Sequence, residues 1–260
     1  MSRARCLLQW CVIGLLVLSP DIFSATAVVD SDDGVFGCSS GDGVDFGDND
    51  DDEKTFSFDF SNSARGWTGG FADYPFGQEA FFELLFDLRP LLPDLNPNRN
   101  GLFISGANRS DDLFMFVKRR VTGLTPGAAY SVVFEVSIGS EAGSDCAGIG
   151  GSPAIALKAG ASATEPLALP DANGFVRMNI DIGNQSQSGA DARVLGDIGV
   201  DVDCANPVFK AKQLRTSTGD LLTVTADDDG GAWLLVGTDS SFEGATRLFY
   251  TAIEARFSLR

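Results

Sequence analysis

Histidine is absent from this chain of 260 residues. Histidine is the general base of Ser-His-Asp and Cys-His hydrolases, and its imidazole is a common ligand of zinc and iron. Both catalytic arrangements and every imidazole-based metal site are therefore excluded. Because the sequence carries no other recognisable catalytic motif, we expect a protein that is not an enzyme.

Basic residues are also few, since 19 Lys and Arg residues stand against 36 Asp and Glu residues, for a net charge of −17 at pH 7. Nucleic acid and anionic membrane surfaces repel such a chain. One basic cluster, Lys118 to Arg120, does not make a nucleic-acid site. We expect no nucleic-acid partner and interpret the acidity as a source of solubility outside the cell.

The chain has one long apolar run, from Leu7 to Leu18. Arg3 and Arg5 precede it and the small residues Ala25 to Ala27 follow it, which is the pattern of a secretory signal peptide cleaved after Ala27. A membrane anchor is the alternative, but Gln9 interrupts the run, which is shorter than the roughly 20 residues that span a bilayer. We therefore predict a signal peptide over residues 1–27, no membrane span, and a secreted, extracellular or periplasmic protein.

Cysteines are scarce, and two of the five, Cys6 and Cys11, lie in the predicted signal peptide. In an oxidising compartment Cys146 and Cys204 are the natural disulfide pair, because both lie in Gly- and Asp-rich loops of the folded part. Cys38 is then a free or intermolecular thiol, with a lipid anchor as the alternative.

Residues 28–54 are rich in Asp, Gly and Ser and have no apolar periodicity. A segment of this composition cannot bury enough apolar surface to fold, so we predict a disordered acidic leader. The folded domain is expected from residue 55 to residue 260.

Phenylalanine and glycine are abundant, at 20 and 30 copies, and they favour sheets and turns. Apolar runs on either side of Thr122–Gly127 predict a β-hairpin, and the runs around Asp227–Gly231 predict a second one. The segment Glu79–Leu92 suits a helix or a strand, and we favour a strand. About ten short strands without internal repeats predict a single all-β domain, a jelly-roll-like antiparallel β-sandwich.

Several motifs resemble those of a family of exported, uncharacterised bacterial proteins: GWTGGFADYP, GLFISGANRSDDLFMFVKR, VTGLTPGAAYSVVFEV, CAGIGGSP, LKAGASATEP and GTDSSFEGATRLFYTAIEARFS. The resemblance runs from about residue 56 to the C-terminus. It implies export and no particular activity.

A weaker likeness is to carbohydrate-binding modules and galactose-binding-like jelly rolls, carried by the Gly66-Trp67 pair after an acidic first strand and by the TGLTPGAAY turn. The likeness implies a sandwich that often holds a structural calcium ion between its first and last strands. Asp59 matches the acid of the first strand, but Thr251 stands where the last strand should carry one.

Four further carboxylates, Asp111, Asp112, Asp239 and Glu243, are predicted to lie in loops beside strands. Together with Asp59 they are candidate calcium ligands, because calcium prefers carboxylate oxygens. Hydrogen bonding within Asx turns explains the same residues without a metal.

Aromatic residues next to glycine or proline are the candidates for stacking on a sugar ring. Trp67 and Tyr74 are of this kind, although capping of the core explains them equally well. Trp233 lies within an apolar run and is expected in the core.

The features together favour a secreted, non-catalytic binding module for carbohydrate or another extracellular polymer. One alternative is a structural or adhesive surface protein without a small ligand. Another is a glycosidase or lyase that works through carboxylates, which 35 acidic residues after the signal peptide leave open.

Overall fold

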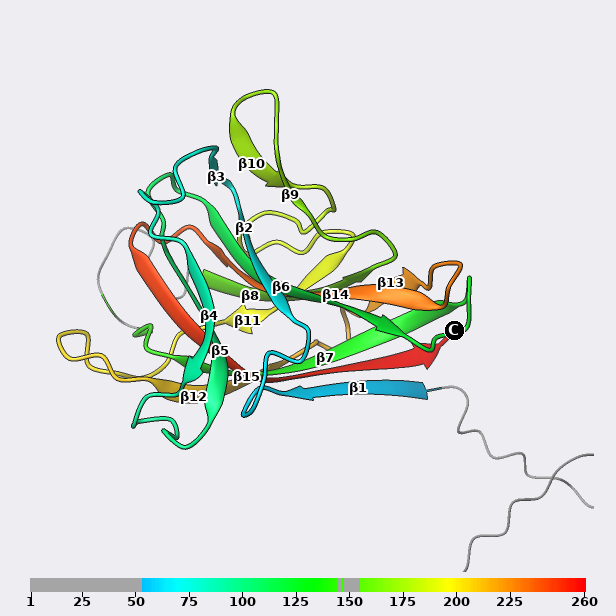
Figure 1. Cartoon of the computed structure of the whole chain (residues 1–260), viewed down its shortest axis with the longest axis horizontal. Helices are drawn as coiled ribbons and strands as arrows, with labels where there is room; N and C mark the ends of the chain where they lie inside the picture. Colours follow the sequence, from blue (N-terminus) through cyan, green and yellow to red (C-terminus); the bar gives the residue numbers. More distant parts are fainter. Residues whose placement is uncertain (1–52, 145, 147–154) are drawn as a thin grey trace, which may run out of the picture. The chain divides into compact units, whose positions relative to one another are not determined.

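The computed structural model describes residues 53–144, 146 and 155–260. This part of the chain contains strands and turns and no helix (Figure 1). The predicted signal peptide and residues 28–52 of the predicted leader lie outside the described residues. The first strand begins at Glu53, two residues before the expected start of the domain.

Two large antiparallel sheets form the domain, as the sequence predicted. Sheet A runs in the order β12-β7-β15-β5-β4, with β1 also on β15 and β13 also on β7. Its strands are β1 (Glu53–Asp59), β4 (Leu85–Pro90), β5 (Asn100–Ala107), β7 (Ala129–Ser140), β12 (Lys210–Arg215), β13 (Leu222–Thr225) and β15 (Ala245–Leu259).

Sheet B runs in the order β11-β8-β14-β6-β2. Its strands are β2 (Thr68–Ala72), β6 (Leu113–Thr122), β8 (Ile155–Ser162), β11 (Ala192–Asp197) and β14 (Gly231–Ser240). A small third sheet has the order β3-β10-β9, from strands β3 (Tyr74–Pro75), β9 (Ala168–Pro170) and β10 (Phe175–Met178).

Both predicted hairpins are wrong, because each turn joins strands of different sheets. β6 pairs with β14 and β2 in sheet B, whereas β7 pairs with β15, β12 and β13 in sheet A. Likewise β13 belongs to sheet A and β14 to sheet B. Turn residues predict that the chain reverses, but they do not determine whether the two arms bond to each other or face each other across the core.

The two inter-sheet turns pack together. The amide of Leu124 donates to the carbonyl of Gly230 (3.0 Å), and the amide of Gly127 donates to the carbonyl of Ala226 (3.2 Å). Leu124 is buried beneath them. These contacts close one end of the sandwich.

Aromatic side chains fill much of the interior, as the phenylalanine content suggested. Each such ring contributes about 1.5–3 kcal/mol on burial. The largest fully buried aromatic residues are Phe60, Phe82, Phe114, Phe116, Phe134, Phe249, Phe257 and Tyr250.

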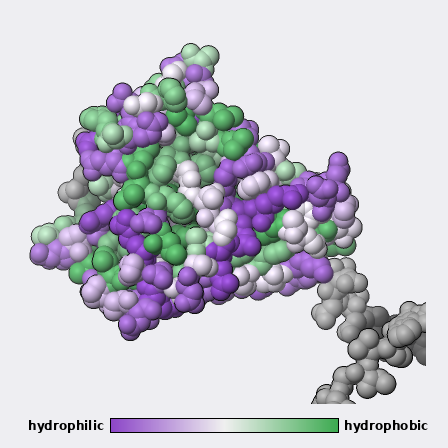
Figure 2. Space-filling view, in the orientation of Figure 1, coloured by the Kyte–Doolittle hydropathy of each residue, from purple (hydrophilic) through white to green (hydrophobic). Residues whose placement is uncertain are grey.

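Where β2 of sheet B faces β4 of sheet A, the edge of the sandwich is closed by an aromatic side chain that packs directly against a glycine. A Cβ atom at Gly69 of β2 would lie 2.2 Å from Cγ of Phe86 on β4, so only glycine allows this approach. Figure 2 shows apolar surface in the region of β2, between β4 and β6. The predicted strand over 79–92 is correct only for Leu85–Pro90, because residues 79–83 form a turn in which Glu83 has a φ of 54° and the strand ends at Pro90.

The outer face of sheet B is covered rather than open. Phe114 and Phe116 of β6 point to this face with Leu235 of β14, and Ile182 packs on them together with half-buried Met178. Strand β10 ends at Met178, and Ile180 and Ile182, which follow it, form part of the cover. None of the described residues forms a helix long and apolar enough to cross a membrane.

Candidate functional site

A cavity of about 420 Å³ opens between sheet B and its cover, and we call it the aspartate cavity. It is lined by Asp73, Asp112, Arg177, Met178, Ile180, Asp181, Ile182, Gly183 and Asn184.

Strand pairing brings its acidic residues together. Ala72 of β2 and Asp239 of β14 both pair with Phe114 of β6, so all three lie in one row across sheet B. Asp73 directly follows β2 and Asp112 directly precedes β6. Antiparallel order therefore places three carboxyl groups from distant parts of the sequence at the same end of the sheet.

A buried ion pair lies behind the cavity wall. Nζ of Lys158 on β8 is 2.7 Å from Oδ2 of Asp239, and the two side chains are 0% and 2% exposed. Lys158 also donates to the carbonyl of Ile182 (2.9 Å), which ties the cover to the sheet. A buried charge of either sign needs such partners, because transfer out of water is costly.

Asp112 lies between this ion pair and the cavity. The Oδ1 atoms of Asp112 and Asp239 are both buried, and neither has a hydrogen-bond donor among the other described residues. Burial raises the pKa of Asp112 to about 8, with further contributions from the charges of Asp239 and Asp73 and from hydrogen bonding with Asp239. Two carboxyl oxygens can form such a bond only if a proton lies between them, so Asp112 carries a proton at neutral pH.

Arg177 on β10 also lines the cavity. Its Nη1 is 2.6 Å from Oδ1 of Asp73 and 3.9 Å from Oδ2 of Asp112. Burial raises the pKa of Asp73 despite this guanidinium. At the rim, Asp181 accepts hydrogen bonds from the amides of Gly183 and Ala190 (both 2.9 Å), which lower its pKa. The cavity thus presents carboxylate acceptors together with a guanidinium donor.

We expect stability to fall as the pH rises from about 4 to about 8, because folded Asp112 keeps a proton that the unfolded chain releases above its ordinary value of 3.8. Asn at position 112 keeps a donor towards Asp239 but does not titrate. The stability of Asp112→Asn relative to wild type should therefore increase between pH 5 and pH 8, by at least about 1 kcal/mol, since one pKa unit corresponds to about 1.4 kcal/mol. Urea unfolding at both pH values measures this, and a constant difference between the two proteins would contradict it.

Only two of the five candidate calcium ligands meet in this site. Asp112 and Asp239 do, although Asp239 lies within β14 and not in the expected loop. Asp111 and Glu243 are exposed and outside it. Asp59 ends β1, where it pairs with Arg99. Among the described residues, no group of three or more His, Cys, Asp or Glu side chains is arranged to hold a metal ion.

At Asp59 the structure contains the Asx turn that was the alternative to calcium. Its Oδ1 accepts a hydrogen bond from the amide of Ser61 (2.8 Å). The calcium hypothesis for the five residues remains a prediction.

The two aromatic candidates are core residues. Trp67 is 2% exposed and packs edge-on against Phe58 and Phe60, and Tyr74 is 6% exposed beside Phe82. The structure thus corrects the interpretation of both as ring platforms, because neither ring has a free face. Trp233, which was expected in the core, is instead half-buried on the outer face of sheet B, with Nζ of Lys118 5.4 Å from its ring centre.

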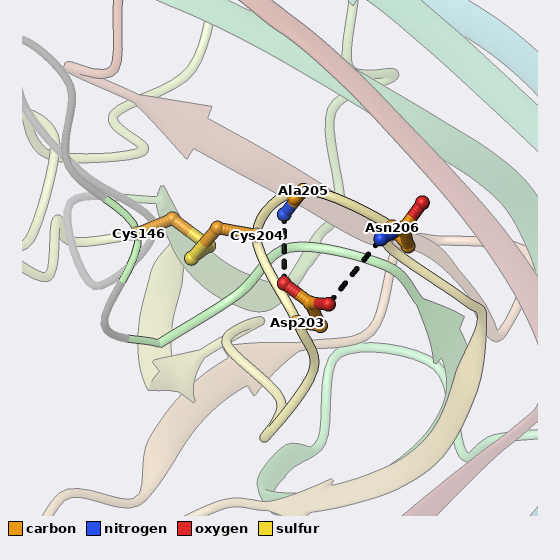
Figure 3. The surroundings of a disulfide bond; sticks show 5 residues. All are labelled: Cys146, Asp203, Cys204, Ala205 and Asn206. Atoms are coloured by element: carbon orange, nitrogen blue, oxygen red, sulfur yellow. Dashed lines mark hydrogen bonds between the residues drawn. A yellow bond between two sulfur atoms is a disulfide. The ribbon is translucent and has the colours of Figure 1, made fainter.

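Cys146 and Cys204 form a disulfide, the pair that the sequence suggested (Figure 3). Their Cα atoms are 5.4 Å apart. Asp203 shapes the turn beside it, accepting from the amide of Ala205 (2.9 Å) and the side chain of Asn206 (3.4 Å). The bond links the segment after β7 to the segment before β12, two strands that pair in sheet A.

The sequence did not predict three residues that line the aspartate cavity or lie behind its wall: Asp73, Arg177 and Lys158. Lys158 gave a usable signal, since it is the single charged residue in the strand IALKAGAS. Every residue of that strand is buried, and a buried lysine requires an acidic partner. Asp73 and Arg177 gave no signal, because their proximity depends on the third sheet.

A larger cavity of about 620 Å³ lies along β1 and β15. Its carboxylates are already ion-paired, Asp59 with Arg99, Glu135 with Arg215 and Glu254 with Arg256. None of its lining residues has a buried polar side-chain atom without a partner. The aspartate cavity is therefore the better candidate for a binding site.

No family model matches this chain, and no curated protein matches it. The resemblance to exported bacterial proteins therefore has no support from sequence families.

Solved structures similar to this chain include β-sandwich domains and carbohydrate-binding modules. One is a module, TmCBM27, studied for mannan recognition, with 11% identity, a TM-score of 0.34 and coverage of 78% of this chain and 97% of that one. Another is the K1 cleaved adhesin domain of the Lys-gingipain of Porphyromonas gingivalis, with 10% identity, a TM-score of 0.34 and coverage of 78% and 97%. A third is the enzymatically active domain of tailspike protein 4 of bacteriophage CBA120, with 11% identity and a TM-score of 0.34; the match covers 75% of this chain but 20% of that one.

Proposed function

We propose that this protein is a non-catalytic module that binds an extracellular glycan in the aspartate cavity. The observation that carries the proposal is a solvent-open cavity of about 420 Å³ with carboxylate, guanidinium and amide side chains around it. Binding sites for small ligands typically have volumes of about 300–1,000 Å³ and a few polar groups that fix orientation.

The walls suit a sugar ring in two ways. Asp73, Asp112 and Arg177 are planar groups that hydrogen-bond to neighbouring hydroxyls, and charge-assisted bonds of this kind are strong. Met178 and Ile180 also line the cavity, and their side chains supply apolar surface for the C–H face of a ring. Because Asp73 and Arg177 already hold each other at 2.6 Å, the site is organised before a ligand arrives.

Binding is favoured over hydrolysis because one of the two carboxyl groups is buried away from the cavity. Glycosidases place their catalytic pair about 5–5.5 Å or about 6.5–9.5 Å apart so that substrate or water fits between them. Asp239, beside Asp112, is instead 2% exposed and paired with Lys158. This geometry leaves Asp239 no access to a sugar.

The test is a glycan array probed with residues 28–260 as wild type, Arg177→Ala and Arg215→Ala. Arg215 is the matched control, an exposed, ion-paired arginine on sheet A. We expect wild type and Arg215→Ala to bind the same glycans, and Arg177→Ala to bind them at least about tenfold more weakly, because a lost charged hydrogen bond costs about 1.5–3 kcal/mol.

Two results would contradict this function. One is the absence of binding to any glycan, which would favour the adhesive alternative. The other is the release of reducing ends from a bound polysaccharide by wild type, which would show an enzyme.

A further inference from the structure

The pair of Lys158 and Asp239 is the most deeply buried ion pair among the described residues. Nζ of Lys158 lies 2.7 Å from Oδ2 of Asp239, and the two side chains are 0% and 2% exposed. Lys158 pairs with Gly237 in the ladder of β8 and β14, so Asp239 lies two positions further along β14 on the same face of sheet B. The two side chains therefore meet diagonally across adjacent strands, and the backbone ladder fixes their contact.

Apolar side chains shield this pair from bulk water. A Cβ atom at Gly237 would lie 2.6 Å from Cζ of Phe114, so the aromatic ring covers the position opposite Lys158. Ile182, whose carbonyl accepts from Lys158 (2.9 Å), belongs to the same buried cluster as Phe114. Charged groups are costly in such surroundings. Transfer of one proton from Nζ to Oδ2 removes both charges and leaves an amine in contact with a carboxylic acid.

A second carboxyl group contacts Asp239. Asp112 hydrogen-bonds with it and carries a proton at neutral pH, because burial raises the pKa of Asp112 to about 8. Asp112 is 26% exposed and also lines the aspartate cavity. Asp239 is thus in contact with a nitrogen nucleophile and with a proton donor.

We propose that Lys158 and Asp239 condense to form an intramolecular amide bond, with Asp112 as the acid that assists the reaction. Nζ of Lys158 attacks Cγ of Asp239, and the proton of Asp112 stabilises the oxygen that becomes negative. The Nζ–Cγ bond forms and one Cγ–O bond breaks. The oxygen leaves with two hydrogens of the ammonium group as one water molecule, and Asp112 regains its proton. The step needs no oxidant, reductant or further reactant.

Two features favour condensation over hydrolysis here. The 2.7 Å contact makes the reaction intramolecular, and well-oriented groups reach effective concentrations of about 10⁵–10⁸ M. Burial of the pair excludes the water that would reverse the reaction, while the aspartate cavity next to Asp112 gives the released molecule an exit. The product joins β8 to β14 covalently, across 81 positions of the sequence.

Lys118 and Glu165 provide a comparison within the same chain. Nζ of Lys118 is also 2.7 Å from Oε1 of Glu165, but the two side chains are 13% and 42% exposed. Water therefore solvates this carboxylate and favours its charged form. We expect the second pair to remain an ion pair.

The test is the mass of residues 28–260 after denaturation and reduction of the disulfide. Wild type should weigh less than its sequence by one water molecule, and tryptic peptide mapping should link Lys158 to Asp239 and leave Lys118 free. Mapping is required because ring closure at Asp229–Gly230 releases the same molecule. Lys158→Arg should keep the full sequence mass, since a guanidinium stays protonated and does not attack.

Two neighbouring aspartates test the role of the acid. Asp112→Asn should form the bond at least about a hundredfold more slowly than wild type, because a positioned proton donor contributes about 10²–10⁴-fold. Asp111→Asn makes the same change at an exposed position, where asparagine tolerates the φ of 67°, and should react as fast as wild type. Mass spectra taken at intervals after dilution of unfolded, unreacted protein from urea measure these rates.

Three results would contradict the proposal. Wild type with its full sequence mass would overturn it, and so would a link that maps to any other pair of residues. Equal rates for Asp112→Asn and wild type would overturn the role of Asp112. The mass of wild type stays decisive if the variants fold poorly. Because the reaction needs no glycan, each of these results is independent of the proposed binding function.

Discussion

Replacing Lys158 by Met should destabilise the protein by about 3–5 kcal/mol, the usual cost of removing one partner from a buried ion pair. The Lys158 side chain is 0% exposed, and its ammonium group holds both Asp239 and the carbonyl of Ile182. The substitution leaves Asp239 without a counter-charge beside Asp112 and frees the cover of sheet B. Urea unfolding followed by tryptophan fluorescence measures the loss.

Two further variants show whether the ion pair is the cause. Lys54→Met makes the same change on the exposed part of β1 and should alter stability by no more than about 0.5 kcal/mol. The double variant Lys158→Met with Asp239→Leu should recover much of the loss, because it removes the unpaired charge. A cost below about 1 kcal/mol for Lys158→Met alone would show that the pair contributes little.

Removing the disulfide should have an effect of similar size. Cys146 and Cys204 are separated by 58 positions in the sequence, and closure of a loop of that length restricts the unfolded chain by about 4 kcal/mol in the chain-entropy account. The bond joins the ends of β7 and β12 outside their ladder, which ends at the pair Lys210 and Ser140. The variant Cys146→Ser with Cys204→Ser should therefore unfold at lower urea concentration.

Reduction of the wild-type protein supplies the control for this variant. Wild type in reductant should unfold at the same urea concentration as the double serine variant, and reductant should leave the variant unchanged. If the double variant is as stable as oxidised wild type, the bond does not restrain the chain as the loop length implies.

Local patterns in the sequence were enough to predict the fold class and several features of the core. Alternating apolar residues in β7, the apolar run of β6 and the supply of glycine turns were enough to predict an antiparallel sandwich with a core rich in phenylalanine, and the disulfide pair followed from the position of two cysteines in loops. Each of these features depends on residues close in sequence or on composition. They are therefore visible without a structure.

Local sequence patterns did not predict which strands pair with each other. The turns at 122–127 and 227–231 have the composition of hairpin turns, but each connects the two layers, because both flanking strands bury a face in the shared core. Trp67 and Tyr74 have neighbours typical of an exposed rim, yet their rings are buried, since contacts from Phe58, Phe60 and Phe82 come from other elements.

The sequence by itself determined the fold class and the presence of acidic residues near strands, because these depend on composition and on periodicity along a single strand. The tertiary structure alone decided which of those acids meet. Asp73, Asp112 and Asp239 come together because β2 and β14 finish and β6 begins at the same end of sheet B, and Lys158 and Arg177 reach them from β8 and from the third sheet. Such a site is a property of strand order, which no stretch of the chain encodes locally.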